Sequence, residues 1–229
     1  IGGLPAVQSN QMVQIISEFA LPVLSFDNQL VFNMICGLII AVLAGTVIIG
    51  GLTRIAKASS WLVPIMGGLY VLTATFILIA NFEDVPSVIK IIFSDAFTGT
   101  SVAGGTLMGV IMYGIQRGAF SNEAGIGTEA LIHGTAKTNN PIKQGFVAMI
   151  GPIFDTLLIC TATAVVIILS GLWMGDQYSG VSLTAMAFQT FLGSAGIAVV
   201  FLCVVFFGIS TIFTYSYYGS VCARFLFGP

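Results

Sequence analysis

Residues 29–52 form a predominantly apolar run of 24 positions without a charged side chain, and this run limits the possible folds more than any other feature. About 20 such residues in a helix cross the hydrocarbon layer of a bilayer. Further runs of this kind follow, and only 7% of all residues are charged, whereas a soluble domain carries about 25%. The runs do not alternate with polar residues, so the spanning elements should be helices. We therefore predict an all-α, polytopic membrane protein.

Apolar length and charge together divide the chain into segments of a single transmembrane domain, residues 1–229. We expect a partial helix at 1–26 and five full transmembrane helices at about 29–52, 61–82, 101–117, 144–172 and 197–219. A polar segment at 118–143 should contain a short helix near 128–136, and residues 181–193 should form another. The segment at 85–97 is too short and too amphipathic to span, so it should lie in the interface plane.

The distribution of positive charge predicts how these helices are oriented in the membrane. If they alternate in direction, six of the seven Lys and Arg residues fall on one side: Arg54, Lys57, Arg117, Lys137, Lys143 and Arg224. Positive residues gather in cytoplasmic loops, so this side, with the polar segment 118–143, should face the cytoplasm. We expect a multi-pass protein of the plasma membrane, in contact with the lipid bilayer.

Several classes of function find no support in the remaining residues. The positive charges are scattered and form no patch for nucleic acid. The four cysteines lie singly in apolar runs, and His133 has no Cys or His close in sequence, so we expect neither a structural metal nor a cofactor. The sequence has no Ser–His–Asp pattern, phosphate-binding glycine loop or HExxH motif. We do not expect an enzyme.

Asp155 is the residue that the apolar pattern explains least. It lies 11 residues after Gln144, which places it roughly 16 Å into the expected span, near the middle of the bilayer. A carboxylate at that depth is costly unless it meets a cation, a cavity or a paired group. Thr156 adds a hydroxyl oxygen, and oxygen ligands suit hard cations. We predict sodium at Asp155 and Thr156; the alternative is a structural hydrogen bond or ion pair to another helix.

Pro152 adds to this interpretation. Proline lacks an N–H group, so the carbonyl of Ala148 loses its helical partner. A freed carbonyl beside a buried carboxylate is a usual component of a cation site in a membrane. A simple kink is the alternative, because prolines are tolerated in membrane helices.

Two further segments carry polar residues that suggest a role. In RGAFSNEAGIGT (117–128) we single out Asn122 and Glu123 for cation binding or gating, with an ordinary cytoplasmic loop as the alternative. In the last span Thr211 and Tyr215 are four residues apart and share a helix face. A hydroxyl beside an aromatic ring suits a small polar solute.

The motifs RGAFSNEAGIGT (117–128), FDTLLICTATA (154–164) and STIFTYSYYG (210–219) occur in this order, with Gln144–Gly145 between the first two. Together with AVQSNQ (6–11) they resemble the sodium-coupled alanine/glycine symporter family along essentially the whole chain. The resemblance implies the inverted-repeat fold of the neurotransmitter-type sodium symporters. It also implies symport of small neutral amino acids, alanine and glycine, into the cell with sodium.

The resemblance further assigns roles to single residues. It implies that Gln8 and Thr211 help to bind the amino acid. Tyr215 stands where the family usually has a tryptophan over the substrate, so an aromatic lid is retained and the choice of substrate is left open. Thr128 stands in place of a commoner serine.

The resemblance also implies that the chain is about half of a full-length member. The family's glycine-rich helix, which carries much of the substrate and sodium site, is not in this sequence. We expect both ends to be cuts and the missing half of the chain to be a partner. Two alternatives stay open: a proton-coupled amino-acid transporter, and a channel-like membrane subunit, which would neither saturate with substrate nor depend on sodium.

Overall fold

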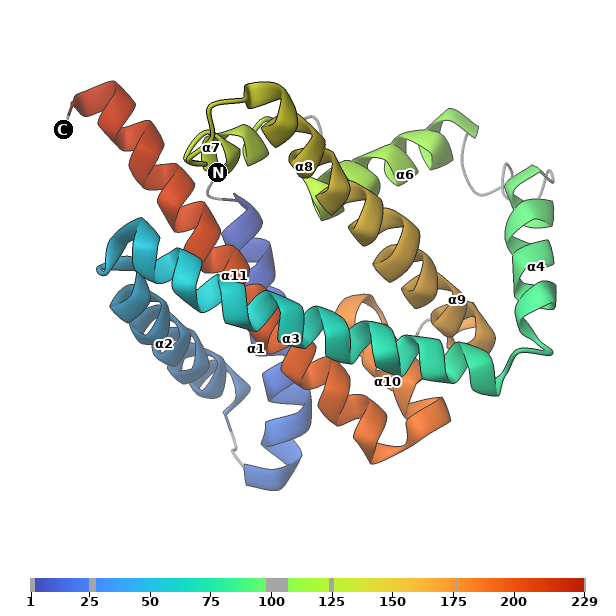
Figure 1. Cartoon of the computed structure of the whole chain (residues 1–229). Coiled ribbons are helices and arrows are strands. Elements are labelled where there is room, and N and C mark those ends of the chain that lie inside the picture. The colour runs from blue at the N-terminus through green and yellow to red at the C-terminus, as the bar shows by residue number, and fades with distance from the viewer. Residues whose placement is uncertain (1–2, 25–27, 98–106, 124–125, 176, 229) are drawn as a thin grey trace. The chain divides into compact units, whose positions relative to one another are not determined.

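The computed structural model in Figure 1 describes residues 3–24, 28–97, 107–123, 126–175 and 177–228. Within these ranges every regular element is a helix and no strand occurs, which confirms the all-α prediction. In chain order the elements are α1 (Gly3–Leu24), α2 (Gln29–Ile48), α3 (Gly51–Ala80), α4 (Val85–Phe97), α6 (Leu107–Asn122), α7 (Glu129–His133), α8 (Pro141–Ile153), the π-helix η1 (Phe154–Cys160), α9 (Thr161–Ser170), the short 3-10 helix η2 (Leu172–Met174), α10 (Gly180–Leu192) and α11 (Ser194–Phe227).

Four helical stretches of the described chain are long and apolar enough to cross a membrane. They are Gln29–Ile48, Thr53–Ala80, Pro141–Ser170 and Ser194–Phe227. Two of them extend past the apolar bounds expected from the sequence, since α3 begins at Gly51 and α11 continues to Phe227. The expected span at 101–117 lies partly outside the described residues, and α6 is the part that can be seen. The grouping of these helices into one membrane domain stays a prediction.

The short helices lie close to the expected positions. The helix α4 occupies Val85–Phe97, and its first turn is anchored at Asp84, whose backbone carbonyl accepts from the N–H groups of Ser87 and Val88 at 3.1 and 3.2 Å. Pro86 follows directly, where a missing N–H costs nothing. The helices α7 and α10 match the expected short helices near 128–136 and 181–193.

The chain divides into two compact units, which we describe separately. The first combines Ile1–Thr73 with Leu172–Pro229, and the second is Ala74–Gly171.

In the first unit α11 packs against α1, α2 and α10, and α1 runs beside α11 in Figure 1. Met12 of α1 is buried over Gly208 of α11, where an added Cβ would lie 2.1 Å from the methionine sulfur. Gly196 of α11 lies against Phe188 of α10, and an added Cβ there would lie 2.3 Å from the backbone oxygen. Small residues let membrane helices approach this closely. Glycine at these two positions therefore sets the close packing of α11.

In the second unit α8, η1 and α9 form one continuous helix from Pro141 to Ser170. Asn140 caps its start, because the side-chain oxygen accepts from two backbone N–H groups of the first turn at 3.1 and 3.2 Å. Gly171, with φ 70°, ends it in the left-handed conformation. The helix α6 packs on η1, and α4 packs on α9.

Candidate functional site

The most unusual backbone of the described chain lies at the predicted cation residues. The seven residues Phe154–Cys160 form a π-helix, with i to i+5 hydrogen bonds, inside the long helix. Such segments are rare and often occur at functional sites. Asp155 is the fifteenth of the 30 residues of this helix, so it lies at the helix midpoint. The helix changes from α to π type two residues after Pro152, and the freed Ala148 carbonyl stays a prediction.

The Asp155 carboxylate contacts a residue of α6 that sequence reasoning did not select. The Ser121 hydroxyl donates to Asp155 Oδ2. The Ser121 oxygen also lies 3.3 Å from the Cys160 sulfur, which is itself 3.9 Å from Asp155 Oδ2. A carboxylate, a hydroxyl and a thiol thus meet where α6 ends against η1.

A second pair of residues lies beside the first. The Asn122 side-chain N–H donates to Thr156 Oγ1 at 2.9 Å. The last two residues of α6 therefore bond to two consecutive residues of η1, Ser121 to Asp155 and Asn122 to Thr156. The structure brings together three of the four residues predicted for the cation, and their oxygens are ligands that a hard cation prefers.

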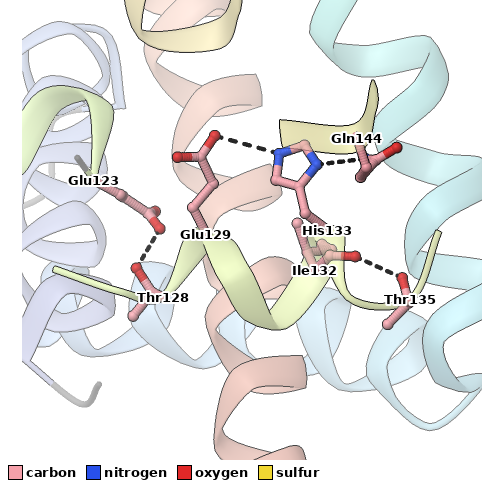
Figure 2. A network of polar contacts seen from close by, with 7 residues as sticks. All are labelled: Glu123, Thr128, Glu129, Ile132, His133, Thr135 and Gln144. Atoms are coloured by element: carbon pink, nitrogen blue, oxygen red, sulfur yellow. Dashed lines mark hydrogen bonds and ion pairs between the residues drawn. The ribbon is translucent and has the colours of Figure 1, made fainter. Parts of the chain in front are cut away.

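Glu123, the fourth predicted residue, has a different partner. Its backbone is left-handed, with φ 57°, which is uncommon for a residue other than glycine. Its carboxylate accepts from the buried Thr128 hydroxyl at 2.6 Å, as Figure 2 shows. The contact ties the end of α6 to the start of α7. The partner of Glu123 therefore lies at the start of α7, and its role in cation binding or gating stays a prediction.

A polar network on α7 and α8 was not anticipated from the sequence. His133 Nε2 lies 3.3 Å from Glu129 Oε1, and the Gln144 amide donates to His133 Nδ1 at 2.7 Å; both contacts are drawn in Figure 2. These three residues line a cavity of about 510 Å³ whose other walls are mostly Ala and Gly. The spacing of Glu129 and His133, four residues apart on a helix, is the sequence signal that could have indicated the pair.

The residues predicted for the amino acid all belong to the first unit. Gln8 lies half-buried on α1, and Thr211 lies half-buried on α11. Tyr215 is one turn further along α11 and is 2% exposed. Its ring packs edge-on against Tyr218, with centroids 5.2 Å apart. Since α1 packs on α11, the three residues occupy two neighbouring helices.

The first unit also contains a polar seam between α1 and α10 that sequence reasoning did not find. Gln14 Nε2 donates to Ser182 Oγ at 3.0 Å, and Ser182 Oγ donates to Glu18 Oε1 at 2.6 Å. Gln11 Oε1 accepts from the backbone N–H of Val181 at 3.3 Å, in the first turn of α10. The spacing of these α1 residues places them on one face, but their partners lie more than 160 residues away in sequence.

A protein-family model and several known transporters match this sequence. The model of the sodium:alanine symporter family matches residues 1–229. The chain is 43% identical over 204 residues to the uncharacterized transporter YflA of Bacillus subtilis, covering 86% of this chain and 43% of YflA. It is 37% identical over 198 residues to the sodium/alanine symporter AgcS of Methanococcus maripaludis, covering 85% of this chain and 44% of AgcS.

A third relative carries a different substrate in its name. The chain is 36% identical over 204 residues to the probable sodium/glutamine symporter GlnT of Bacillus subtilis, covering 89% of this chain and 43% of GlnT. The chain thus spans less than half the length of each of these relatives.

Proposed function

The chain belongs to the sodium:alanine symporter family, and from that premise we propose that the whole protein carries alanine or glycine into the cell together with sodium. Its long apolar helices are those of a multi-pass protein of the cell membrane. The family consists of transporters, and the residues described here supply part of the transport machinery. The protein would work as a secondary transporter, with binding near the membrane midplane and alternating access to the two sides.

One observation supports this proposal more than any other. Asp155 lies at the midpoint of a 30-residue apolar helix, in a π-helical segment, and a hydroxyl from α6 bonds to it. Ionisable residues inside membrane helices are costly and mark ion pathways. We assign sodium to Asp155 and Thr156, with Asn122 holding the Thr156 hydroxyl and Glu123 acting at the gate.

For the amino acid we propose Gln8, Thr211 and Tyr215. Polar atoms of Gln8 and Thr211 would orient the charged groups of a small amino acid, and the Tyr215 ring would cover its side chain. The rest of the protein supplies further contacts. The named substrates of two relatives, alanine for AgcS and glutamine for GlnT, make glutamine the first competitor to test.

The test is uptake by the full-length protein in sealed lipid vesicles. With an inward sodium gradient, uptake of labelled alanine and glycine should saturate and should stop when choline replaces sodium. Uptake that neither saturates nor requires sodium would contradict the proposal and indicate a channel. A pH gradient applied without sodium tests proton coupling, and excess unlabelled glutamine tests the substrate range.

A further inference from the structure

The Ser121 hydroxyl has a single hydrogen and two acceptors within reach. The Ser121 hydroxyl donates to Asp155 Oδ2. The Cys160 sulfur lies 3.3 Å from the Ser121 oxygen, in a contact in which either atom can be the donor. A hydroxyl rotates freely and also offers two lone pairs. The position of one hydrogen therefore decides which way the Ser121 oxygen presents those lone pairs.

The π-helix places the two acceptors side by side. Asp155 and Cys160 are five residues apart, and in an α-helix such residues point about 140° away from each other. In a π-helix residues i and i+5 are hydrogen-bond partners and lie close together. Both side chains consequently reach Ser121, and they lie 3.9 Å apart, from Cys160 Sγ to Asp155 Oδ2. An α-helical register would separate this group of three.

The two hydroxyl orientations have different consequences for a cation. With the hydrogen on Asp155, the carboxylate has a neutral donor in front of it. With the hydrogen turned to the Cys160 sulfur, a weak acceptor, the Ser121 oxygen and the Asp155 carboxylate can both face one cation. No covalent bond forms or breaks in this change.

We propose that Ser121 is a further ligand of the cation site, a hydroxyl that turns from Asp155 to Cys160 when sodium binds. The proposal rests on the proposed sodium role of Asp155. It assigns functions to Ser121 and Cys160, the residues that complete the group where α6 meets η1. Cys160 is the acceptor that frees the Ser121 oxygen, so it positions the ligand without contacting sodium.

The experiment measures the sodium dependence of alanine uptake by the full-length protein in vesicles. Ser121→Ala should raise the sodium concentration for half-maximal uptake about tenfold, the effect of losing one contact to a charge, while the alanine KM at saturating sodium changes less than about twofold. Cys160→Ala should raise it about threefold, because the hydroxyl hydrogen loses its second acceptor. Cys160→Ser should restore the wild-type value, since a hydroxyl accepts in place of the sulfur.

Ser220→Ala is the matched control, because the Ser220 hydroxyl bonds only to the Tyr217 carbonyl of its own helix among its described contacts, at 2.8 Å. This variant should leave the sodium concentration for half-maximal alanine uptake unchanged. If Ser121→Ala does not reach the membrane, the Cys160→Ala and Cys160→Ser pair tests the same hydroxyl without changing Ser121.

Asp155→Asn distinguishes a failure of the Ser121 inference from a failure of the proposed sodium site. If Ser121→Ala or Cys160→Ala has the wild-type sodium concentration for half-maximal uptake, the inference is overturned. The proposed function is retained in that case if Asp155→Asn raises this concentration. If Asp155→Asn has the wild-type sodium concentration for half-maximal uptake, both the Ser121 inference and the proposed sodium role of Asp155 are overturned.

Discussion

The two compact units hold their polar residues in different ways. In the first unit α11 packs against several helices, α1, α2, α3 and α10 among them, and 33% of its most apolar stretch is buried. In the second unit the described chain buries only 11% of the most apolar stretch of Pro141–Ser170. Tyr215 is accordingly enclosed, while Asp155 is half-buried and Ser121 is exposed within the described chain. Within the described chain, the first unit therefore holds an aromatic side chain in a dense helix contact, and the second unit holds a carboxylate on a helix with few neighbours.

The largest effect should come from the carboxylate of the second unit. Asp155→Asn keeps the shape of the side chain and removes its charge. The sodium concentration for half-maximal uptake should therefore rise about a hundredfold, because the cation loses its charged ligand at membrane depth. The measurement is alanine uptake across a sodium series in vesicles. Asp84→Asn, an exposed carboxylate before α4, is the control and should match wild type.

Packing density itself can be tested with two glycines. Gly196→Ala forces a Cβ to within 2.3 Å of the Phe188 carbonyl, so it should lower the stability of the purified protein by about 1–3 kcal/mol. Gly114→Ala on α6, where an added Cβ meets nothing within 4 Å in the described chain, should be neutral or stabilising by up to about 1 kcal/mol. Thermal unfolding in detergent measures both, and equal melting temperatures would remove the contrast between the units.

A smaller effect is expected at the proposed solute residue of the first unit. Thr211→Val preserves the shape and removes a hydroxyl, so the alanine KM should rise about tenfold with sodium dependence unchanged. Thr214→Val is the matched control, because the Thr214 hydroxyl bonds to the Ser210 carbonyl of its own helix. An alanine KM in Thr211→Val equal to that of the control would remove Thr211 from the solute site.

The smallest effect should be seen in the network of Glu129, His133 and Gln144. His133→Ala removes two half-exposed polar contacts between α7 and α8, and such contacts contribute little. Amide hydrogen exchange in residues 129–135 should quicken about threefold, with uptake within twofold of wild type. Lys137→Gln, an exposed change in the same segment, should leave exchange unchanged; equal exchange in both variants would show that the network does not hold α7.

The fold was predicted wherever local pattern decides it. Apolar length located the long helices, and amphipathic spacing gave α4 its bounds at Val85–Phe97. Pro152 indicated altered hydrogen bonding in the long helix, and the helix type changes two residues after it. The π-helix itself was not predicted, because hydrophobic periodicity is too coarse to detect about one extra residue per turn.

The candidate sites were predicted only in part. Asp155 and Thr156 stood out because a charge and a hydroxyl interrupt an apolar run. Ser121 did not stand out in the sequence, because its contact to Asp155 joins residues 34 positions apart. That contact depends on how α6 packs on η1. The bond from Ser182 to Glu18 spans 164 positions and was missed for the same reason. Glu123 was selected by its charge, and its left-handed backbone could not be inferred from composition.

The π-helix also gives the second unit a mechanical property. A long α-helix is a stiff rod, and a widened segment with different hydrogen bonding is a compliant joint within it. Load applied at either end of Pro141–Ser170 would concentrate as bending near its middle, where Asp155 and Cys160 lie. An ion bound by both Asp155 and Ser121 would link η1 to α6 and reduce bending at the π-helical segment. The stiffness of the helix would then increase with the occupancy of the site.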